Sequence, residues 1–336
     1  MHMLPIEEMR AKAQGATALQ IAFIGVVNHL FSLLHELGEA SPQELAQRAQ
    51  LDAGYVERWC DAAYAFAWLE RTADRFRLSE EGDAMRPEHP ESRMALAIGT
   101  VLGAHMAERA AVLMRTGERP GEKVLAERES ILPWFGPMLE QTFRPIFTQM
   151  VLGHLPILAE VDQRGGLVVD LGCGNGWYLR ALLHHYSQLR GLGLDGFEEN
   201  IRQATELAAN EGLSSRVQFA KGDIHHFQLG EMADLIAMNR ALHHVWEERG
   251  ELFARLHAEL RPGGALLIWE PAWPKDPQVL REAPYRAMAF QNLSEYIQGN
   301  HFLRPEEIEN ALQEAGFRTQ VHELRSDVLV EARRPH

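Results

Sequence analysis

Apolar residues in the first part of the chain recur at helical spacing. From about Ile6 to Leu37 they lie nearly all round the expected helices, a pattern typical of helices buried on most sides, often against a partner subunit. Ser41-Pro42-Gln43-Glu44 predicts a capped start for a helix over residues 42–49, because serine caps free amides, proline suits the first turn and Glu44 completes a capping box. A helix over about 55–68 and a hairpin turning at 72–74 follow, so this region predicts a winged-helix arrangement.

The pattern changes after a mostly helical stretch over about 92–160, which we interpret as a connecting layer. From Gly165 onward, short apolar runs alternate with helical segments, which predicts a parallel, doubly wound α/β sheet. The expected strands are 166–171, 189–194, 217–220, 234–238 and 265–269, and the expected helices are 179–186, 197–210 and 248–260. We therefore expect a winged-helix domain over 1–90, the connecting layer over 91–160 and a Rossmann-like domain over 161–336.

The strongest candidate for chemistry is the glycine loop after the first of these strands, Asp170-Leu171-Gly172-Cys173-Gly174-Asn175-Gly176. Glycines at this place let the backbone approach a ligand and turn tightly into the next helix. The third glycine comes one position earlier than in a dinucleotide fingerprint. The loop therefore suits a nucleoside that carries an amino acid better than a pyrophosphate, and Asp170 can hold the ammonium group of that ligand.

Two further acidic residues end the next two strands. Asp195 follows the second strand, where a carboxylate can accept hydrogen bonds from both ribose hydroxyls. Gly222-Asp223-Ile224 follows the third strand, where a carboxylate can accept from an adenine amino group and the next amide can donate to the ring. A lone aspartate at a strand end is usually a turn or helix cap. Three acidic strand ends in this order favour a nucleoside site instead.

With these motifs, residues 160–336 resemble the class I S-adenosylmethionine-dependent methyltransferases. The resemblance extends to Leu260-Arg261-Pro262-Gly263-Gly264, which looks like the turn before the fifth strand of that family. It implies a seven-stranded Rossmann-like sheet and S-adenosylmethionine as the cofactor. The whole chain is similar to two-domain small-molecule methyltransferases that dimerise through an N-terminal winged-helix domain, which implies a homodimer. The residues expected to bind the cofactor are Asp170, Gly172, Cys173, Gly174, Gly176, Asp195, Gly222, Asp223, Ile224 and Asn239.

Two adjacent histidines follow the fourth strand and are the candidate catalytic residues. His243 and His244 lie where strand ends face the ligand crevice, and His243 resembles the catalytic histidine of plant-like O-methyltransferases. A purely structural role for the pair stays open. We expect no metal, although a site combining either histidine with Glu270 or His301 is an alternative. The substrate wall is expected to include Tyr178, Phe147 and Tyr296, for which ordinary core packing is the competing interpretation.

The composition of the chain disfavours some classes of binding partner. The formal charge of −14 disfavours binding to nucleic acid, and residues 1–85 carry 13 acidic against 7 basic residues, unlike a DNA-reading face. We read no targeting segment or membrane span in the chain and expect a cytoplasmic protein without a membrane partner. Its two cysteines do not suggest a disulfide framework.

The leading functional hypothesis is methyl transfer to a small acceptor in secondary metabolism, with the acceptor atom left open by the sequence. One alternative keeps the fold but lets the amine of S-adenosylmethionine displace its own sulfur, giving azetidine-2-carboxylate and methylthioadenosine. A second alternative is a ligand-sensing regulator, which the acidic front domain disfavours.

Overall fold

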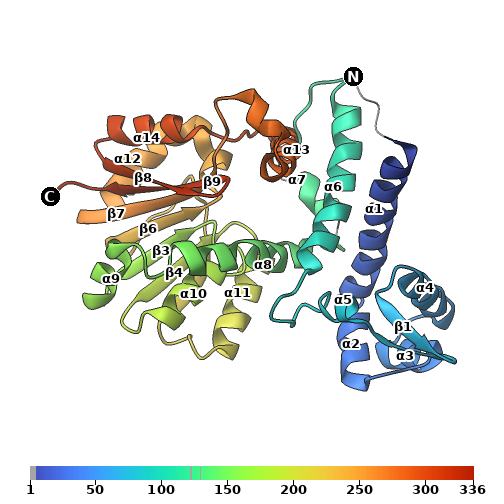
Figure 1. Cartoon of the computed structure of the whole chain (residues 1–336). Helices are drawn as coiled ribbons and strands as arrows, with labels where there is room; N and C mark the ends of the chain where they lie inside the picture. Colours follow the sequence, from blue (N-terminus) through green and yellow to red (C-terminus); the bar gives the residue numbers. More distant parts are fainter. Residues whose placement is uncertain (1–4, 122, 129) are drawn as a thin grey trace. The chain divides into compact units, whose positions relative to one another are not determined.

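The protein folds into two compact units in the computed structural model, which describes residues 5–121, 123–128 and 130–336 (Figure 1). The amino-terminal unit holds the residues up to Arg109 and Leu125–Thr142, and the carboxy-terminal unit holds Ala110–Val124 and Phe143–His336. The expected connecting layer over 91–160 is not a unit of its own. Two long helices, α6 (Met94–Leu113) and α8 (Leu132–Met150), each contribute residues to both units.

The amino-terminal unit is mainly helical. Its other elements are α1 (Ile6–Val27), α2 (Leu30–Leu37), α3 (Pro42–Ala49), α4 (Ala53–Ala65), β1 (Leu69–Thr72), β2 (Arg75–Leu78) and α5 (Glu80–Asp83), and α7 (Lys123–Ala126) lies at the boundary between the units. The capping box of α3 is confirmed, since Glu44 N donates to Ser41 Oγ over 3.2 Å and Ser41 N donates to Glu44 Oε2 over 2.8 Å. Helix α4 ends at Ala65, earlier than expected, because Ala67 adopts a φ of 59° and directs the chain into β1.

Two indole N–H groups tie α1 to the rest of this unit. Trp59 Nε1 donates to Ile21 O over 3.1 Å, and Trp68 Nε1 donates to Ala18 O over 3.0 Å. By length and composition α6 could cross a membrane, as could α1 and α2 taken as one span bent by 70°. Helices buried in the core of a protein can have the same length and apolar composition as membrane-spanning helices.

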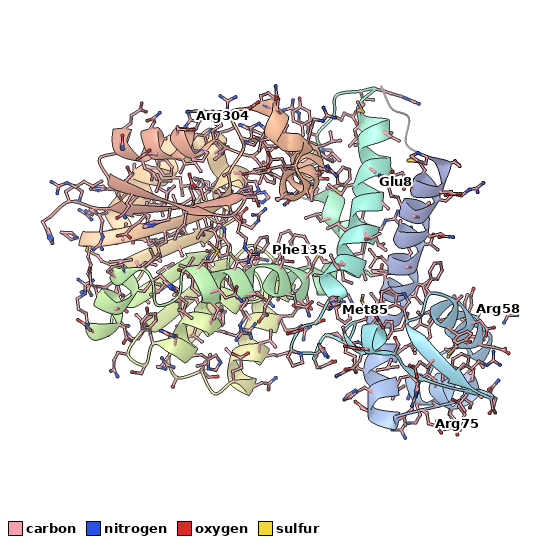
Figure 2. The ribbon with its side chains drawn as sticks, in the orientation of Figure 1. Glu8, Arg58, Arg75, Met85, Phe135 and Arg304 are labelled. Carbon is pink, nitrogen blue, oxygen red and sulfur yellow. The ribbon has the colours of Figure 1, made fainter. Side chains whose placement is uncertain are left out.

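Arginines on α4 and β2 are held by neighbouring groups of the same unit. Arg58 Nη1 donates to Gly54 O over 2.8 Å, and Arg75 pairs with Glu39 at 3.0 Å and Glu44 at 2.9 Å. Figure 2 shows both arginines at the surface of this unit. The positive charge of Arg75 is therefore partly neutralised within the chain, whereas Arg58 is held by a backbone carbonyl.

A seven-stranded mixed sheet forms the centre of the carboxy-terminal unit, in the order β5-β4-β3-β6-β7-β9-β8. The strands are β3 (Leu167–Leu171), β4 (Arg190–Asp195), β5 (Val217–Lys221), β6 (Ala233–Asn239), β7 (Leu260–Pro271), β8 (Arg318–Leu324) and β9 (Asp327–Arg333). The Rossmann-like fold is confirmed, but the sheet is not wholly parallel. Strand β9 runs antiparallel to β7 and β8, because only two residues join β8 to β9 and so short a connection reverses the chain.

The expected turn over 260–264 forms the first part of β7. Ala233 pairs with Leu260, and the register shifts before Leu235 pairs with Ala265. Gly263 adopts a φ of 76° within this irregular stretch, a conformation that favours glycine. The strand therefore begins five residues earlier than the apolar run alone predicts.

Helices cover both faces of the sheet (Figure 1). They are α9 (Pro156–Gln163), α10 (Trp177–His185), α11 (Glu198–Asn210), α12 (Arg249–Glu259) and α14 (Pro305–Glu314). The unit also contains α13 (Ala283–Gln298) and the 3₁₀ segments η1 (Leu242–Glu248) and η2 (Pro277–Arg281). One core joins α9, α10 and the end of α8 to the sheet, around residues such as Phe147 and Leu182. The other core joins α12 and α14 to the opposite face, around Leu256 and Ile308. Both cores consist of apolar side chains.

Candidate active site

Four polar side chains come from the carboxyl ends of neighbouring strands. Asp170 is the penultimate residue of β3, Asp195 ends β4, Asn239 ends β6 and Glu270 is the penultimate residue of β7. Because these strands are adjacent and parallel, the four side chains belong to one edge of the sheet. This is the edge at which open α/β sheets bind ligands.

The glycine loop exposes its backbone at this edge. Gly172, Gly174 and Gly176 have φ values of 75°, 53° and 75°, which side chains rarely adopt. A Cβ on Gly176 would lie 2.5 Å from Phe219, whereas one on Gly174 would meet nothing within 4 Å. Gly176 is thus required for packing, and Gly174 leaves room for a ligand at the backbone.

Asp170 is a buried carboxyl group beside this loop. Only 1% of it is exposed, and Asn239 Nδ2 donates to its Oδ1 over 3.0 Å. Burial raises the pKa of Asp170 to about 8, although the hydrogen bond from Asn239 opposes the change. A buried acid of this kind is stabilised in its charged form by a cationic group, and an ammonium group would supply that charge.

Asp195 links the glycine loop to the start of α11. Its Oδ2 accepts from Gly174 N over 2.9 Å, and its Oδ1 accepts from Phe197 N over 2.9 Å and from Asn200 Nδ2 over 3.0 Å. Each carboxylate oxygen has two lone pairs, so Oδ2 can accept a further hydrogen bond from a ribose hydroxyl. The protein thereby holds this carboxylate in place before any ligand arrives.

The expected adenine contacts lie on the loop after β5. Asp223 is exposed and accepts from His225 N over 2.9 Å, a turn contact that lowers its pKa. Gly222 N donates to the carbonyl of Asp195 over 3.0 Å, which joins this loop to the end of β4. Ile224 is half-buried and lies near Gly172. These residues stay predicted adenine contacts.

Cys173 points into the protein. Its Sγ is so close to Gly193 that a Cβ there would lie 2.8 Å from the sulfur, and the residue is 2% exposed. Its amide donates to Leu194 O over 3.0 Å. The side chain therefore packs the loop against β4, and a ligand contact from this residue would come from its backbone.

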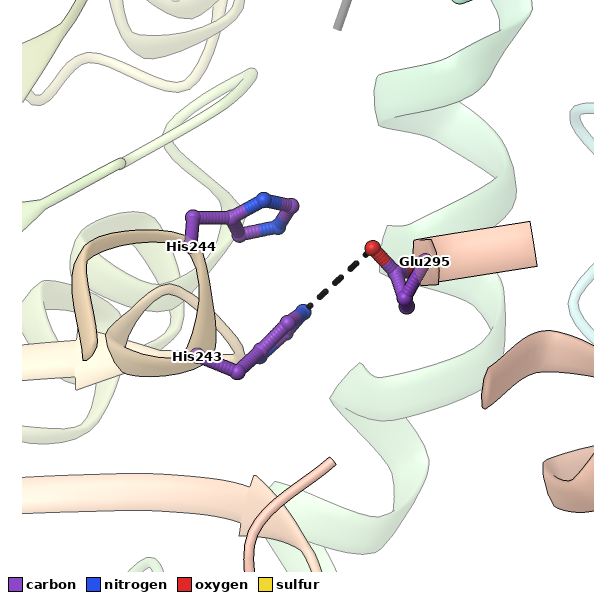
Figure 3. A group of neighbouring side chains, drawn as sticks. All are labelled: His243, His244 and Glu295. Carbon is purple, nitrogen blue, oxygen red and sulfur yellow. Dashed lines mark ion pairs between the residues drawn. The ribbon is translucent and has the colours of Figure 1, made fainter. Parts of the chain in front are cut away.

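His243 lies between two carboxylates. Its Nδ1 contacts Glu270 Oε2 at 2.6 Å, while Oε1 of the same glutamate accepts from Leu242 N over 2.7 Å. Its Nε2 forms an ion pair with Glu295 Oε2 at 3.7 Å (Figure 3) but has no hydrogen-bond partner among the described residues. Glu270 therefore fixes the orientation of the ring and leaves Nε2 on the side of Glu295.

His244 stacks on His243 with ring centroids 4.2 Å apart, and its Nδ1 contacts Asn300 Nδ2 at 2.7 Å. Ligand atoms of His243, His244 and Glu295 all lie within 4.8 Å of one another, whereas His301 is exposed. The sequence suggested a metal site that combines a histidine with Glu270 or His301. In the structure Glu295 is the third member of the cluster instead, while Glu270 contacts the opposite side of the His243 ring.

The two rings have opposite electrostatic surroundings. Burial alone would lower the pKa of His243, but the negative charges of Glu270 and Glu295 outweigh it and raise this pKa to about 9. Burial lowers the pKa of His244 to about 4, and the positive charge of His243 adds to this effect. Near neutral pH, His243 is an imidazolium in the free protein and His244 is neutral.

The three expected substrate contacts do not form one cluster. Tyr178 and Phe147 are buried with ring centroids 4.8 Å apart, whereas Tyr296 on α13 is half-exposed and packs under the guanidinium of Arg119 at 4.0 Å. Glu295, one residue before Tyr296, instead forms an ion pair with His243 at 3.7 Å. Sequence reasoning missed it because no motif marks this helix.

Arg240 is a further residue that sequence reasoning missed. It follows β6, has a φ of 57°, pairs with Asp327 at 3.0 Å and lies over the Phe143 ring at 4.4 Å. Backbone strain of this kind gathers at functional sites. The signal available in the sequence was its place directly after the fourth strand.

These groups fit S-adenosylmethionine. The open backbone at Gly174 admits a ligand, the buried Asp170 suits an ammonium group, and Asp195 suits ribose hydroxyls. Tyr178 Oη is also buried without a hydrogen-bond partner among the described residues. The donors and acceptors at this edge therefore match the parts of that cofactor.

Comparison with known proteins agrees with this assignment. Residues 168–264 match a family model described as "Methyltransferase domain". Trans-aconitate 2-methyltransferase of Acidovorax sp. (strain JS42) is 36% identical over 135 residues, 40% of this chain and 49% of that protein. The chain thus spans about half the length of this curated relative, and less of the next two.

Solved structures resemble the chain over nearly its whole length. Human N-acetylserotonin methyltransferase in complex with the cofactor has a TM-score of 0.73 at 21% identity and covers 100% of this chain and 99% of its own. The O-methyltransferase NcsB1 from neocarzinostatin biosynthesis has a TM-score of 0.67 at 19% identity and covers 97% and 98%. At these identities, the likeness shows the fold.

The fold and the glycine-loop edge together define an S-adenosylmethionine-binding protein of the Rossmann-like class. More particularly, residues 168–264 match a methyltransferase domain, and solved methyltransferase structures share the fold of the chain.

Proposed function

We propose that the protein transfers the methyl group of S-adenosylmethionine to a hydroxyl oxygen of a small molecule, with His243 as the general base. The observation that carries this proposal is the buried Nε2 of His243, held by Glu270 through Nδ1 at the ligand-binding edge of a methyltransferase sheet. Like the N-acetylserotonin and NcsB1 enzymes, it would act on a small acceptor, and we place it in secondary metabolism.

The cofactor supplies an activated methyl group on a positively charged sulfur. In its neutral form, His243 takes the proton of the acceptor hydroxyl at Nε2 while the oxygen–methyl bond forms, the methyl–sulfur bond breaks and S-adenosylhomocysteine leaves. Glu270 stabilises the imidazolium that results, because its carboxylate contacts Nδ1 at 2.6 Å. No metal ion is needed for this transfer.

His244 serves the same step as a positioning residue in this proposal. With its pKa near 4 it is a weak base, poorly matched to a hydroxyl proton. Its ring stacks on His243 at 4.2 Å and contacts Asn300 at 2.7 Å. These contacts restrict the His243 ring to one orientation.

For the amino-terminal unit we propose a winged-helix-like dimerisation module in a cytoplasmic homodimer, without a nucleic-acid or membrane partner. Helices α3 and α4 followed by the β1–β2 hairpin support the first part. Apolar side chains exposed on α1 and α6, such as Met9 and Leu96, support a partner subunit. The acidic charge of the chain and the ion-paired Arg75 support the absence of nucleic acid.

Mass spectrometry of the nucleoside product tests the proposed reaction. The protein is incubated with S-adenosylmethionine and a panel of small phenols and hydroxy acids, with EDTA present. We expect S-adenosylhomocysteine and a methylated acceptor. Formation of methylthioadenosine without any acceptor would contradict methyl transfer and favour cyclisation. Activity that EDTA removes and a divalent ion restores would contradict the histidine base and favour a metal-dependent reaction.

A further inference from the structure

Tyr178 carries a buried hydroxyl group that the proposed chemistry does not use. The residue is 2% exposed, and its Oη has no hydrogen-bond partner among the described residues. Buried tyrosine hydroxyls usually have a partner, because leaving one unpaired in the interior is unfavourable. An unpaired hydroxyl beside a ligand site therefore points to a partner on the ligand.

The ring of Tyr178 is held firmly on its other sides. Its centroid lies 4.8 Å from that of Phe147 and 5.9 Å from that of Trp177, and both neighbours are buried. Tyr178 is the second residue of α10, which begins directly after the glycine loop. The packing therefore fixes the ring in the first turn of α10, two residues after Gly176 of the glycine loop.

The charge of Asp170 acts on the pKa of the Tyr178 hydroxyl. Burial raises the pKa of Tyr178 well above its ordinary value, and the charge of Asp170 adds to the increase, so the phenol stays a neutral donor. Asp170 is the group that suits the ammonium of the cofactor, and the amino-acid end of the cofactor carries a carboxylate next to that ammonium. A carboxylate needs hydrogen-bond donors, which Asp170 cannot supply when ionised.

We propose that the Tyr178 hydroxyl donates a hydrogen bond to the carboxylate of the cofactor's amino-acid end, beside Asp170. The residue then recognises the cofactor rather than the methyl acceptor, for which the sequence suggested it. This inference rests on the proposed use of S-adenosylmethionine. It assigns the tyrosine to the one region of the cofactor that methylthioadenosine lacks.

Calorimetry with three nucleosides tests the proposal without measuring turnover. S-adenosylhomocysteine has the whole amino-acid end, its decarboxylated analogue 5′-deoxy-5′-(3-aminopropylthio)adenosine keeps only the amine, and methylthioadenosine has neither group. For Tyr178→Phe we expect affinity for S-adenosylhomocysteine to fall about 10- to 100-fold, the range for a hydrogen bond to a charged group. Affinities for the other two ligands should stay within about twofold, by the same reasoning.

Tyr186→Phe is the matched control, because it removes a hydroxyl from the residue that follows the same helix. It should leave all three affinities unchanged. Equal loss of all three ligands in Tyr178→Phe, or unchanged binding of S-adenosylhomocysteine, would overturn the proposal. The wild-type protein gives a check that needs no variant: equal affinity for S-adenosylhomocysteine and its decarboxylated analogue would also overturn it. If the wild type binds none of the three nucleosides, the proposed function fails as well.

Discussion

At the scale of single residues, the site depends on how the protein charges one imidazole. His243 is buried between Glu270 and Glu295, and both carboxylates stabilise its protonated form. His244 is adjacent in the chain, but its surroundings keep it neutral. The two histidines therefore differ in chemistry although the sequence presents them as a pair.

Replacing each histidine in turn separates their roles. His243→Ala should lower turnover by about 10²–10⁴, the usual contribution of a general base, with little change in cofactor affinity. His244→Ala should cost only on the order of a few-fold, because it removes support from the neighbouring ring. Both are measured as transfer of labelled methyl to the acceptor found in the product screen. Near-normal turnover of His243→Ala would rule out the base role.

The pH profile should show the influence of the carboxylates. A base with a pKa of about 9 is protonated at neutral pH, so kcat/KM should rise with pH up to about 9. Glu295→Gln removes one of the negative charges that raise the pKa of His243, so the rising limb of this variant should move to lower pH. The other groups that face the site, Glu270, the neutral His244 and the cationic Arg240, are unchanged in this variant. Glu282→Gln, at the exposed start of the same helix, is the control and should not move the limb. An identical limb in Glu295→Gln would contradict the assignment.

The residues of this site were unequally visible in the sequence. Asp170, Asp195 and His243 could be predicted because each follows a strand, and strand ends meet at one edge. Glu295 could not, because it lies 51 residues beyond His244 (295 − 244) and only tertiary folding brings it near. The orphaned hydroxyl of Tyr178 likewise becomes visible only through packing.

At the scale of elements, close packing between β4, β5 and the glycine loop positions the cofactor edge. Gly193 on β4 faces Phe219 on β5 and Cys173 in the loop, and a Cβ there would lie 2.4 Å from Phe219 and 2.8 Å from the sulfur. The alternation of strands and helices predicted these elements. It could not predict the antiparallel β9, since apolar runs carry no direction.

Gly193→Ala tests this packing. The added methyl group should destabilise the protein by about 1–3 kcal/mol, a typical overpacking cost, and weaken nucleoside binding because the loop must move. Urea unfolding and calorimetry measure the two effects. Gly250→Ala in α12, where a Cβ meets nothing within 4 Å, should instead leave binding unchanged and stabilise the helix by about 0.5–1 kcal/mol. Equal stability of the two variants would show that β4 tolerates a side chain.

At the scale of the whole molecule, the two units differ in how fully they bury their apolar surface. The sheet of the carboxy-terminal unit has a core of buried apolar side chains on each face. In the amino-terminal unit, α1 and α6 leave Ile6, Met9 and Leu96 between 51% and 65% exposed. The nearly all-round apolar pattern over residues 6–37 agrees with the exposure of Ile6 and Met9, and we propose that a second copy of the chain covers these exposed side chains.

Light scattering tests whether the chain forms a homodimer. We expect a particle of twice the 38.0 kDa mass of the chain. Met9→Glu combined with Leu96→Glu should give a folded monomer, because two charges placed within an apolar interface are costly to bury. Tyr55→Glu is the matched control: Tyr55 is 81% exposed on α4, outside this surface, so its variant should stay dimeric. A wild-type monomer at working concentration would contradict the homodimer, and a dimer that survives both glutamates would place the interface elsewhere on the chain.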